Sequence, residues 1–290
     1  MGKIFDLRRK ATILVLAFIT FSSNLSSQTK VIAIPEDRQI FNNYIEYIKP
    51  WRSEYKDVIL EKTATYFLGK PYMSHTLDYS DFEFLTVNLR EFDCFTYVET
   101  VIALTLTVKT EEPDFDTFID KLQLIRYRGN EILGYQSRLH YTTDWMFDNS
   151  KKGILENLSE EIGGEKDDKV INFMSEHRSS YNQIKSDDNI FNEIVKVENQ
   201  INSREGFYYL PKEKIAITEP LIPHMSVVGF TTNIEGLDVT HAGFAFRNDG
   251  KLKFIHASSV INEIIIDEQT LSDYCIGRKS CTGVIIAKVL

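Results

Sequence analysis

The periodicity of the apolar residues changes once along this chain, near Pro211, and this change restricts the possible folds more than any other feature. Before Pro211, four segments have the apolar spacing of one helix face: 34–49, 53–68, 94–108 and 115–127. After it, six short segments have strand-like patterns: 215–218, 227–232, 239–246, 252–257, 262–267 and 283–289. Helices followed by strands indicate an α+β fold, with a helical N-terminal half packed on a mainly antiparallel C-terminal sheet.

The first 27 residues have the composition of a secretory signal peptide. Basic residues between Lys3 and Lys10 precede an apolar run over 11–21, and several serines follow it. The run is shorter than the roughly 20 residues that a membrane span needs. We therefore expect a cleaved signal, an exported and periplasmic protein, and no stable membrane span after cleavage. The remaining residues, 28–290, are expected to form a single domain with a charged, helical insertion at about 150–205.

Composition narrows the possible partners. The formal net charge is −9, and loss of the basic leader would make the protein more acidic. Nucleic acid and anionic membrane surfaces are therefore poor candidates for partners. The chain has three cysteines, and an odd number in an exported protein suggests a free thiol. Cys275 and Cys281 are close enough in sequence to form a disulfide, and the sequence leaves open whether they do.

Cys94 stands at the start of the strongest helical segment. Asp93 before it is a good N-cap residue, so Cys94 falls in the first turn, where backbone N–H groups lack helical partners. These groups and the helix dipole favour negative charge, and we expect them to lower the pKa of the thiol. The alternative is that Cys94 is a small buried apolar residue. The two histidines downstream favour a nucleophile.

Residues 239–257 predict a β-hairpin that carries these two histidines. The residues Asn248-Asp249-Gly250 between the strands are typical of a turn. If Asn248-Asp249 is a two-residue loop, Arg247 pairs with Gly250 and His241 lies directly opposite His256. If Gly250 forms a bulge, the register slips by one residue. In the first case, His241 could accept the thiol proton and His256 could orient the His241 ring.

The sequence contains no pattern that indicates a metal site. No cluster of Cys and His residues has the spacing of zinc ligands, so we predict neither a metal nor another cofactor. His75, His177 and His224 are interpreted as ordinary surface or core histidines.

The order of a cysteine on a helix, a histidine on a strand and a polar residue on the next strand resembles the NlpC-type cell-wall cysteine hydrolases. These enzymes have a papain-like fold, so the resemblance implies that fold here. In detail the chain resembles a narrower branch, the N-acetylmuramoyl-L-alanine amidase-like proteins. The segments that carry this resemblance are LGKPY at 68–72, FDCFTYVETVIAL at 92–104, SRLHYTTDW at 137–145, NFMSEH at 172–177 and GLDVTHAGFAF at 236–246.

The resemblance implies specific roles for residues. Cys94 corresponds to the nucleophile, His241 to the base and His256 to the orienting third member, and the Cys94 N–H would be one oxyanion donor. The resemblance also suggests residues near the substrate, with Arg138 as a partner for a substrate carboxylate: Tyr72, Arg138, His140 and Tyr141. A turn-anchoring Tyr72 and a structural ion pair of Arg138 are the alternatives.

The expected substrates are peptidoglycan fragments. The resemblance implies hydrolysis of the amide that joins the lactyl group of N-acetylmuramic acid to L-alanine. Three alternatives remain: an endopeptidase that cuts the stem peptide after D-glutamate, a non-catalytic muropeptide-binding protein, and an acyltransferase on the same scaffold. The sequence identifies a nucleophile but does not identify the bond that is cut.

Overall fold

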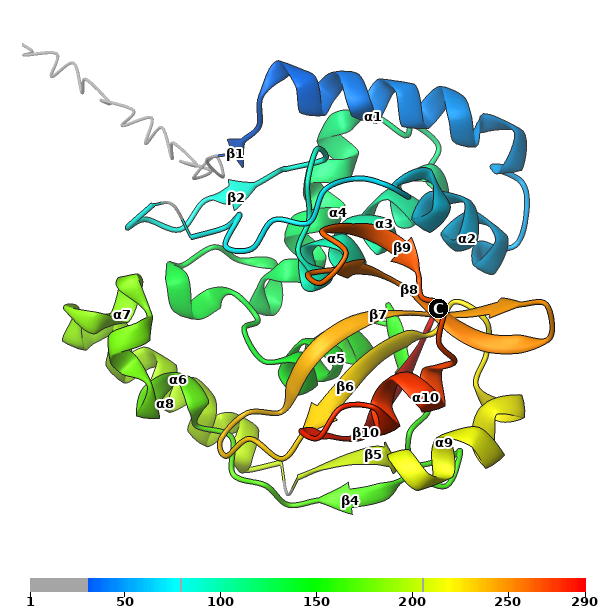
Figure 1. Cartoon of the computed structure of the whole chain (residues 1–290). Coiled ribbons are helices and arrows are strands. Elements are labelled where there is room, and N and C mark those ends of the chain that lie inside the picture. Colours follow the sequence, from blue (N-terminus) through cyan, green and yellow to red (C-terminus); the bar gives the residue numbers. More distant parts are fainter. Residues whose placement is uncertain (1–30, 79, 205) are drawn as a thin grey trace, which may run out of the picture.

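The computed structural model describes residues 31–78, 80–204 and 206–290 (Figure 1). The expected signal peptide, residues 1–27, lies outside the described residues. The helices are α1 Pro35–Ile48, α2 Lys56–Tyr66, α3 Cys94–Val108, α4 Phe115–Arg126, α5 Thr142–Lys151, α6 Phe173–Glu176, α7 Asn182–Lys185, α8 Asp188–Asn202, α9 Lys212–Thr218 and α10 Leu271–Ile276. The strands are β1 Val31–Ile32, β2 Leu85–Thr86, β3 Leu155–Asn157, β4 Glu165–Asp167, β5 Phe207–Pro211, β6 Val227–Thr232, β7 Val239–Asn248, β8 Lys251–Ser258, β9 Glu263–Ile266 and β10 Cys281–Val289.

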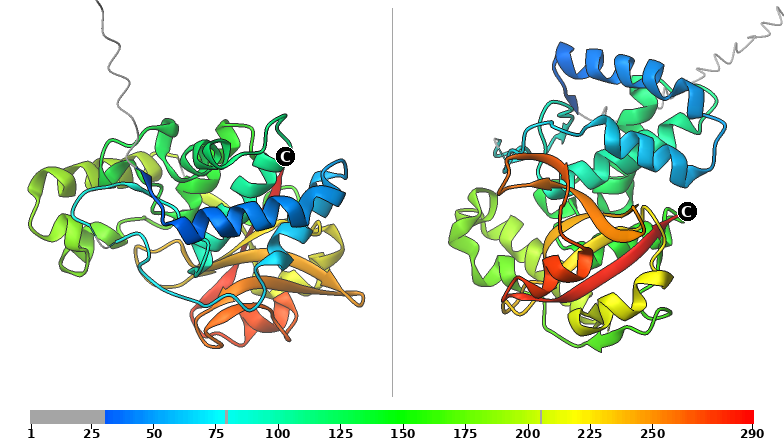
Figure 2. Two further views of the ribbon diagram at one scale, coloured as in Figure 1. Left: turned by 90° about the horizontal axis from the view of Figure 1, so that it is seen from above. Right: turned by 45° about the vertical axis from the view of Figure 1, so that its right-hand side comes forward.

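One antiparallel sheet organises the C-terminal half, and the α+β prediction is confirmed. Its strand order is β4-β5-β10-β6-β7-β8-β9, with β3 paired to β10 at one end. The N-terminal helices lie on one side of this sheet, and α9 and α10 lie on the other (Figures 1 and 2). Both faces of the sheet are therefore covered.

Alternating side chains of the central strands fill two separate cores. Val227 and Ile255 belong to the large core shared with α1–α5, whereas Val228 and Phe254 belong to the smaller core beneath α9 and α10. Successive residues of a strand point to opposite faces, which explains why neighbours in sequence enter different cores. Residues on the α10 side of β7 and β8 carry the candidate chemistry described below.

The segment 215–218 is wrong as a predicted strand, because it lies in helix α9. Ile215 and Thr218 are buried and lie three residues apart, as on one helix face, whereas Ile217 is 82% exposed. The alternation of Ile215 and Ile217 imitated a strand, but only the first of the two faces the core.

The insertion at about 150–205 is only partly helical. Residues 155–157 and 165–167 are short strands, β3 and β4, that extend the main sheet. The helices α6, α7 and α8 follow and form a third apolar cluster with Tyr135 and Tyr141. Within the part of the chain that the structure describes, no helix has the length and hydropathy needed to cross a bilayer.

Candidate active site

The turn of the β7–β8 hairpin consists of Asp249 and Gly250. Both have positive φ angles, 49° and 76°, as a two-residue type I′ turn requires. Asn248 therefore pairs with Lys251, and Phe244 pairs with Ile255. The expected pairing of Arg247 with Gly250, and the alternative slip by one residue, are both wrong, because the register differs by two residues from the first.

A shift of two residues leaves the two histidines on the same face of the sheet, since side-chain direction repeats every two residues. Continuing the register places Gly243 opposite His256, so His241 is the diagonal neighbour of His256. The Nε2 atom of His241 lies 2.6 Å from Nδ1 of His256, and the two rings are nearly perpendicular at 87°. The predicted contact between the imidazoles exists, although by a different register.

Gly243 leaves space for this diagonal contact. A Cβ atom on residue 243 would lie 2.9 Å from the His256 Cβ and 2.7 Å from the Ile255 carbonyl oxygen. Those distances are too short for any other residue type without movement of the strand that carries His256. The missing side chain is therefore part of how the pair is built.

Asp267 extends the pair to a chain of three groups, and the sequence analysis missed it. Its Oδ2 lies 3.3 Å from Nε2 of His256. A carboxylate can only accept, so His256 donates from Nε2 and its neutral Nδ1 accepts a proton from His241 Nε2–H. This order leaves a lone pair on Nδ1 of His241. Asp267 thus fixes through His256 the tautomer that a general base needs.

Cys94 is the first residue of α3, as predicted. The Asp93 carboxylate accepts hydrogen bonds from the N–H groups of Phe95 and Thr96, and Thr96 accepts one from the Asp93 N–H, which forms a capping box. Cys94 is half-buried as a residue, and the N–H of Ala242, the residue that directly follows His241, is a hydrogen-bond donor to its sulfur. The helix start therefore holds the sulfur beside the strand of the candidate base.

The electrostatics differ from the sequence expectation. Burial, and secondarily the Asp93 carboxylate, raise the pKa of Cys94 to about 12, against the lowering effect of the backbone N–H groups. Burial lowers the pKa of both His241 and His256 to about 3. The expected low thiol pKa is therefore wrong for the free protein. The resting pair is a neutral thiol and a neutral imidazole, so proton transfer must accompany attack on a substrate.

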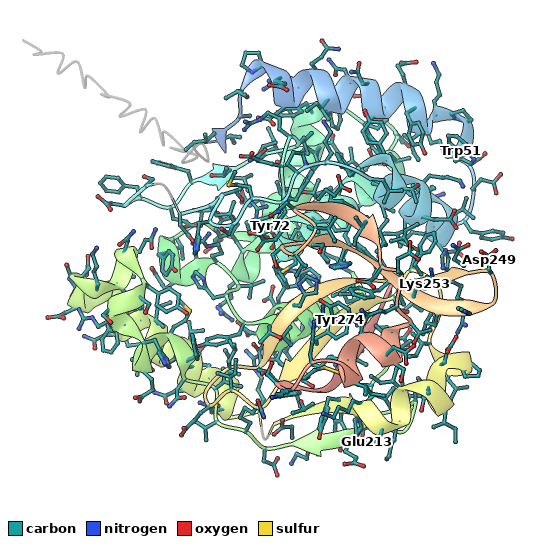
Figure 3. All side chains as sticks on the ribbon, in the orientation of Figure 1. Trp51, Tyr72, Glu213, Asp249, Lys253 and Tyr274 are labelled. Atoms are coloured by element: carbon teal, nitrogen blue, oxygen red, sulfur yellow. A yellow bond between two sulfur atoms is a disulfide. The ribbon has the colours of Figure 1, made fainter. Side chains whose placement is uncertain are left out.

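Aromatic residues enclose the pair. The His241 ring lies 5.9 Å from the Phe230 ring and 6.1 Å from the Tyr274 ring, and the latter also lies 5.8 Å from the His256 ring. Tyr72 approaches from the opposite segment, close enough for the charges of Cys94 and Asp93 to contribute, after burial, to a raised pKa of its hydroxyl. Figure 3 labels Tyr72 and Tyr274 in the central part of the molecule.

Tyr72 owes its position to the segment that follows α2. Gly69 takes a positive φ of 77° and donates its N–H to Ile264, and Tyr72 donates its own to Asn262. Met73 donates its N–H to the Phe92 carbonyl, so the segment is fixed between the start of β9 and the residues just before α3. The structure thus brings Tyr72 to the cysteine.

Comparison with known proteins shows the family of this chain. The family model of N-acetylmuramoyl-L-alanine amidase-like proteins (AmiA-like) matches residues 62–282. This chain belongs to the N-acetylmuramoyl-L-alanine amidase-like family. The matched range contains all the groups described above, from Tyr72 to Tyr274.

Several solved structures of bacterial proteins are similar to this amidase-like protein. An N-acetylmuramoyl-L-alanine amidase from Bacteroides uniformis is 34% identical, with a TM-score of 0.75, and the match covers 81% of this chain and 99% of that one. A putative xylanase from Bacteroides fragilis is 33% identical, with a TM-score of 0.75 and coverages of 78% and 99%. A Legionella pneumophila protein shares the fold at 20% identity, with a TM-score of 0.63 and coverages of 88% and 93%. No protein with a curated description matches the chain.

The other residues expected near the substrate of this amidase-like protein have internal partners. Arg138 bonds Asp78 at 2.7 Å, forms an ion pair with Glu83 at 3.4 Å and is 7% exposed. The Tyr141 hydroxyl donates to Glu198 and accepts from the Met174 N–H, inside the core of the α6–α8 segment. The structure therefore gives Arg138 and Tyr141 structural contacts, and their roles toward substrate stay predictions.

His140 is a half-buried neighbour of Arg138. It donates from Nε2 to the Tyr135 carbonyl at 2.7 Å, and burial together with the Arg138 charge lowers its pKa to about 3. Within the described residues, no group of three or more His, Cys, Asp or Glu side chains is arranged to hold a metal ion.

Acid should destabilise this amidase-like protein between about pH 6.5 and pH 3. His140, His241 and His256 are neutral in the folded state, with pKa values lowered to about 3, whereas a histidine in the unfolded chain titrates near about 6.5. In this window the unfolded chain binds more protons than the folded protein does. The free energy of unfolding therefore decreases as the pH is lowered, by up to about 1.4 kcal/mol per pH unit for each histidine. Thermal unfolding followed by circular dichroism measures this slope, which should become shallower in His140→Gln. An equal slope in that variant would contradict the assignment.

Proposed function

We propose that this protein is a cysteine-dependent peptidoglycan hydrolase, an N-acetylmuramoyl-L-alanine amidase with a papain-like NlpC-type fold. The observation that carries the proposal is the ordered chain Asp267–His256–His241 beside a thiol at a helix start. Its membership of the amidase-like family, and the relatives named as amidases, support the choice of substrate. The favoured bond joins the lactyl group of muramic acid to L-alanine.

The proposed reaction begins with a coupled proton transfer. The Cys94 sulfur attacks the amide carbonyl carbon while its proton moves to Nδ1 of His241, and the Cys94 N–H at the helix start stabilises the oxyanion. His241 then gives this proton to the nitrogen of the leaving peptide, the C–N bond breaks and a thioester remains. A water molecule, deprotonated by His241, releases the lactyl carboxylic acid and restores the thiol.

Because Cys94 and His241 are both neutral at rest, His241 must become positively charged when it accepts the thiol proton. Its imidazolium form is disfavoured by burial, so the positive charge that forms during attack needs stabilisation. The hydrogen bond to His256, itself bonded to Asp267, supplies part of it. Asp267 and His256 thus orient and polarise the base and do not themselves exchange protons with the substrate.

The bond that is cut is best determined by mass spectrometry. Defined muropeptides incubated with residues 28–290 should yield free stem peptide and a sugar that ends in the lactyl acid. Products cut after D-glutamate, with L-Ala-D-Glu still on the sugar, would replace the amidase proposal by the endopeptidase alternative. Binding of muropeptide with no product at any enzyme concentration would favour a non-catalytic binding protein.

Activity should survive chelation and be lost on alkylation. The proposed acid–base groups are side chains, so EDTA should leave the rate unchanged, whereas iodoacetamide should abolish it as Cys94 is modified. Because the thiol pKa is raised, alkylation should be slow near neutral pH and should accelerate as the pH rises. Activity that EDTA removes and zinc restores would refute the cysteine mechanism.

The leader peptide supports export, and we propose a periplasmic location on that basis. A fusion of residues 1–27 to a reporter enzyme that is active only outside the cytoplasm tests this directly. A reporter that stays inactive would contradict the proposal without affecting the assignment of the reaction.

A further inference from the structure

Arg278 lies beside the catalytic histidines in the turn that follows α10. Its guanidinium carbon is 3.1 Å from the centroid of the Tyr274 ring. That ring in turn lies 6.1 Å from the His241 ring and 5.8 Å from the His256 ring. The guanidinium is thus one side chain away from the candidate base, and it is half-buried and so in reach of solvent.

The protein leaves the charge of Arg278 without a counter-ion. Nη1 donates to the Tyr274 carbonyl at 2.9 Å, and across the described residues no carboxylate forms an ion pair with Arg278. Arg138, by contrast, is held by the carboxylates of Asp78 and Glu83. In an acidic protein of net charge −9, an arginine without an acidic partner beside the active site requires an explanation.

The turn that carries Arg278 is fixed in place. Arg278 donates its N–H to the Cys275 carbonyl at 3.2 Å, and its own carbonyl accepts from Cys281 at 3.1 Å. Cys275 and Cys281 are joined by a disulfide, which settles a pairing that the sequence left open. The covalent ring restrains the backbone at Arg278, so less backbone entropy is lost when a ligand binds at this turn.

This position has an electrostatic cost for the free enzyme. The positive charge of Arg278 contributes, after burial, to the lowered pKa values of His256 and, together with His256 itself, of His241. It therefore disfavours the imidazolium that the reaction must form. A negative group of the substrate bound at Arg278 would offset the positive charge of the guanidinium and so favour the imidazolium form of His241 during the attack of Cys94.

We infer that Arg278 is a substrate-binding residue that takes a carboxylate of the stem peptide on the leaving side of the scissile amide. The inference rests on the proposed function. In the favoured substrate the leaving peptide is L-Ala followed by D-Glu, whose α-carboxylate is free because the peptide continues through the side chain. Two extended residues span about 7 Å, and the Tyr274 ring that contacts Arg278 lies 6.1 Å from the His241 ring. The edge of the guanidinium that Tyr274 does not use can bind a carboxylate in bidentate fashion.

Two substrates that differ at one group test this inference: N-acetylmuramoyl-L-Ala-D-Glu and its carboxamide, N-acetylmuramoyl-L-Ala-D-isoGln. Wild-type enzyme should hydrolyse the carboxylate with a kcat/KM about 10- to 100-fold above that for the amide. In Arg278→Gln this preference should disappear, because only the carboxylate substrate loses a partner. Lys279→Gln, which removes the exposed neighbouring cation, should keep the wild-type preference.

Two results would overturn the inference. A wild-type enzyme that does not distinguish the two substrates would do so, as would an Arg278→Gln variant that is slowed by the same factor on both and so keeps the wild-type preference, which is the behaviour of a structural residue. If the wild type hydrolyses neither substrate, the proposed function fails instead. Binding of the two compounds to Cys94→Ala by calorimetry then decides the inference separately, with tighter binding of the carboxylate expected and equal binding contradicting it.

Discussion

Cys94→Ala should lower the rate of muropeptide hydrolysis by about 10⁵-fold or more, as is typical for the loss of a catalytic nucleophile. No other group in the site can form the thioester, and Cys275 and Cys281 are consumed in a disulfide. The fold should be unaffected, because the Asp93 cap of α3 uses the backbone and not the thiol. Release of stem peptide, followed by mass spectrometry, measures the rate.

Cys94→Ser is the matched control for shape. It keeps a hydroxyl of similar size at the helix start, so its melting temperature should equal that of the wild type while its activity stays near that of the alanine variant. Wild-type turnover by the alanine variant would exclude Cys94 from the mechanism. A melting temperature that drops in both variants would indicate a structural role for the thiol.

His241→Gln should reduce kcat/KM by about 10²–10⁴-fold, as expected for loss of a general base. His256→Gln should retain more activity, because a glutamine can still accept the hydrogen bond from His241 Nε2–H. Asp267→Asn should be the mildest of the three changes, since an amide oxygen can still accept from His256 Nε2–H. Steady-state kinetics on one muropeptide give the order.

The relative activities of the His241 and His256 variants test the roles assigned to the two residues, and a reversed ranking would contradict them. A His256→Gln variant that is more impaired than His241→Gln would make His256 the base and His241 the orienting residue. In that event His256 would have to reach the thiol. The contact of the Ala242 N–H with Cys94 points instead to the segment of His241.

The fold was predictable where one physical signal dominated. The helix at 94–108 has a capping residue at its start and a long apolar face, and it was predicted with both ends correct. Some short elements were not predicted correctly, because a window of three to seven residues often cannot separate a strand from one buried helix turn. Residues 212–218 and the strands 155–157 and 165–167 are of this kind, and their neighbours in space determine their form.

The contact between the two histidines was predictable because side-chain direction along a strand repeats every two residues. The turn of the hairpin was placed one residue too early, yet the two histidines still meet, because an error of two in the register preserves the face. Asp-Gly at 249–250 was the available signal for the correct turn.

Asp267 and Arg278 could not be found in this way. The end of β9 and the turn after α10 reach the histidines only through tertiary packing, and no spacing in the sequence encodes that approach. The low thiol pKa was wrong for a related reason. The helix start was visible in the sequence, but the degree to which the folded protein shields the sulfur from water was not.

The close packing at Gly243 affects how mutational data on this protein should be interpreted. Every substitution there puts an atom against the strand of His256, although residue 243 has no side chain to meet a substrate. In a scan that scores cellular abundance and enzymatic output separately, small replacements such as alanine should remain abundant and yet lose output. A position with that signature would ordinarily be assigned to substrate contact, whereas here the requirement is that no side chain lies against His256.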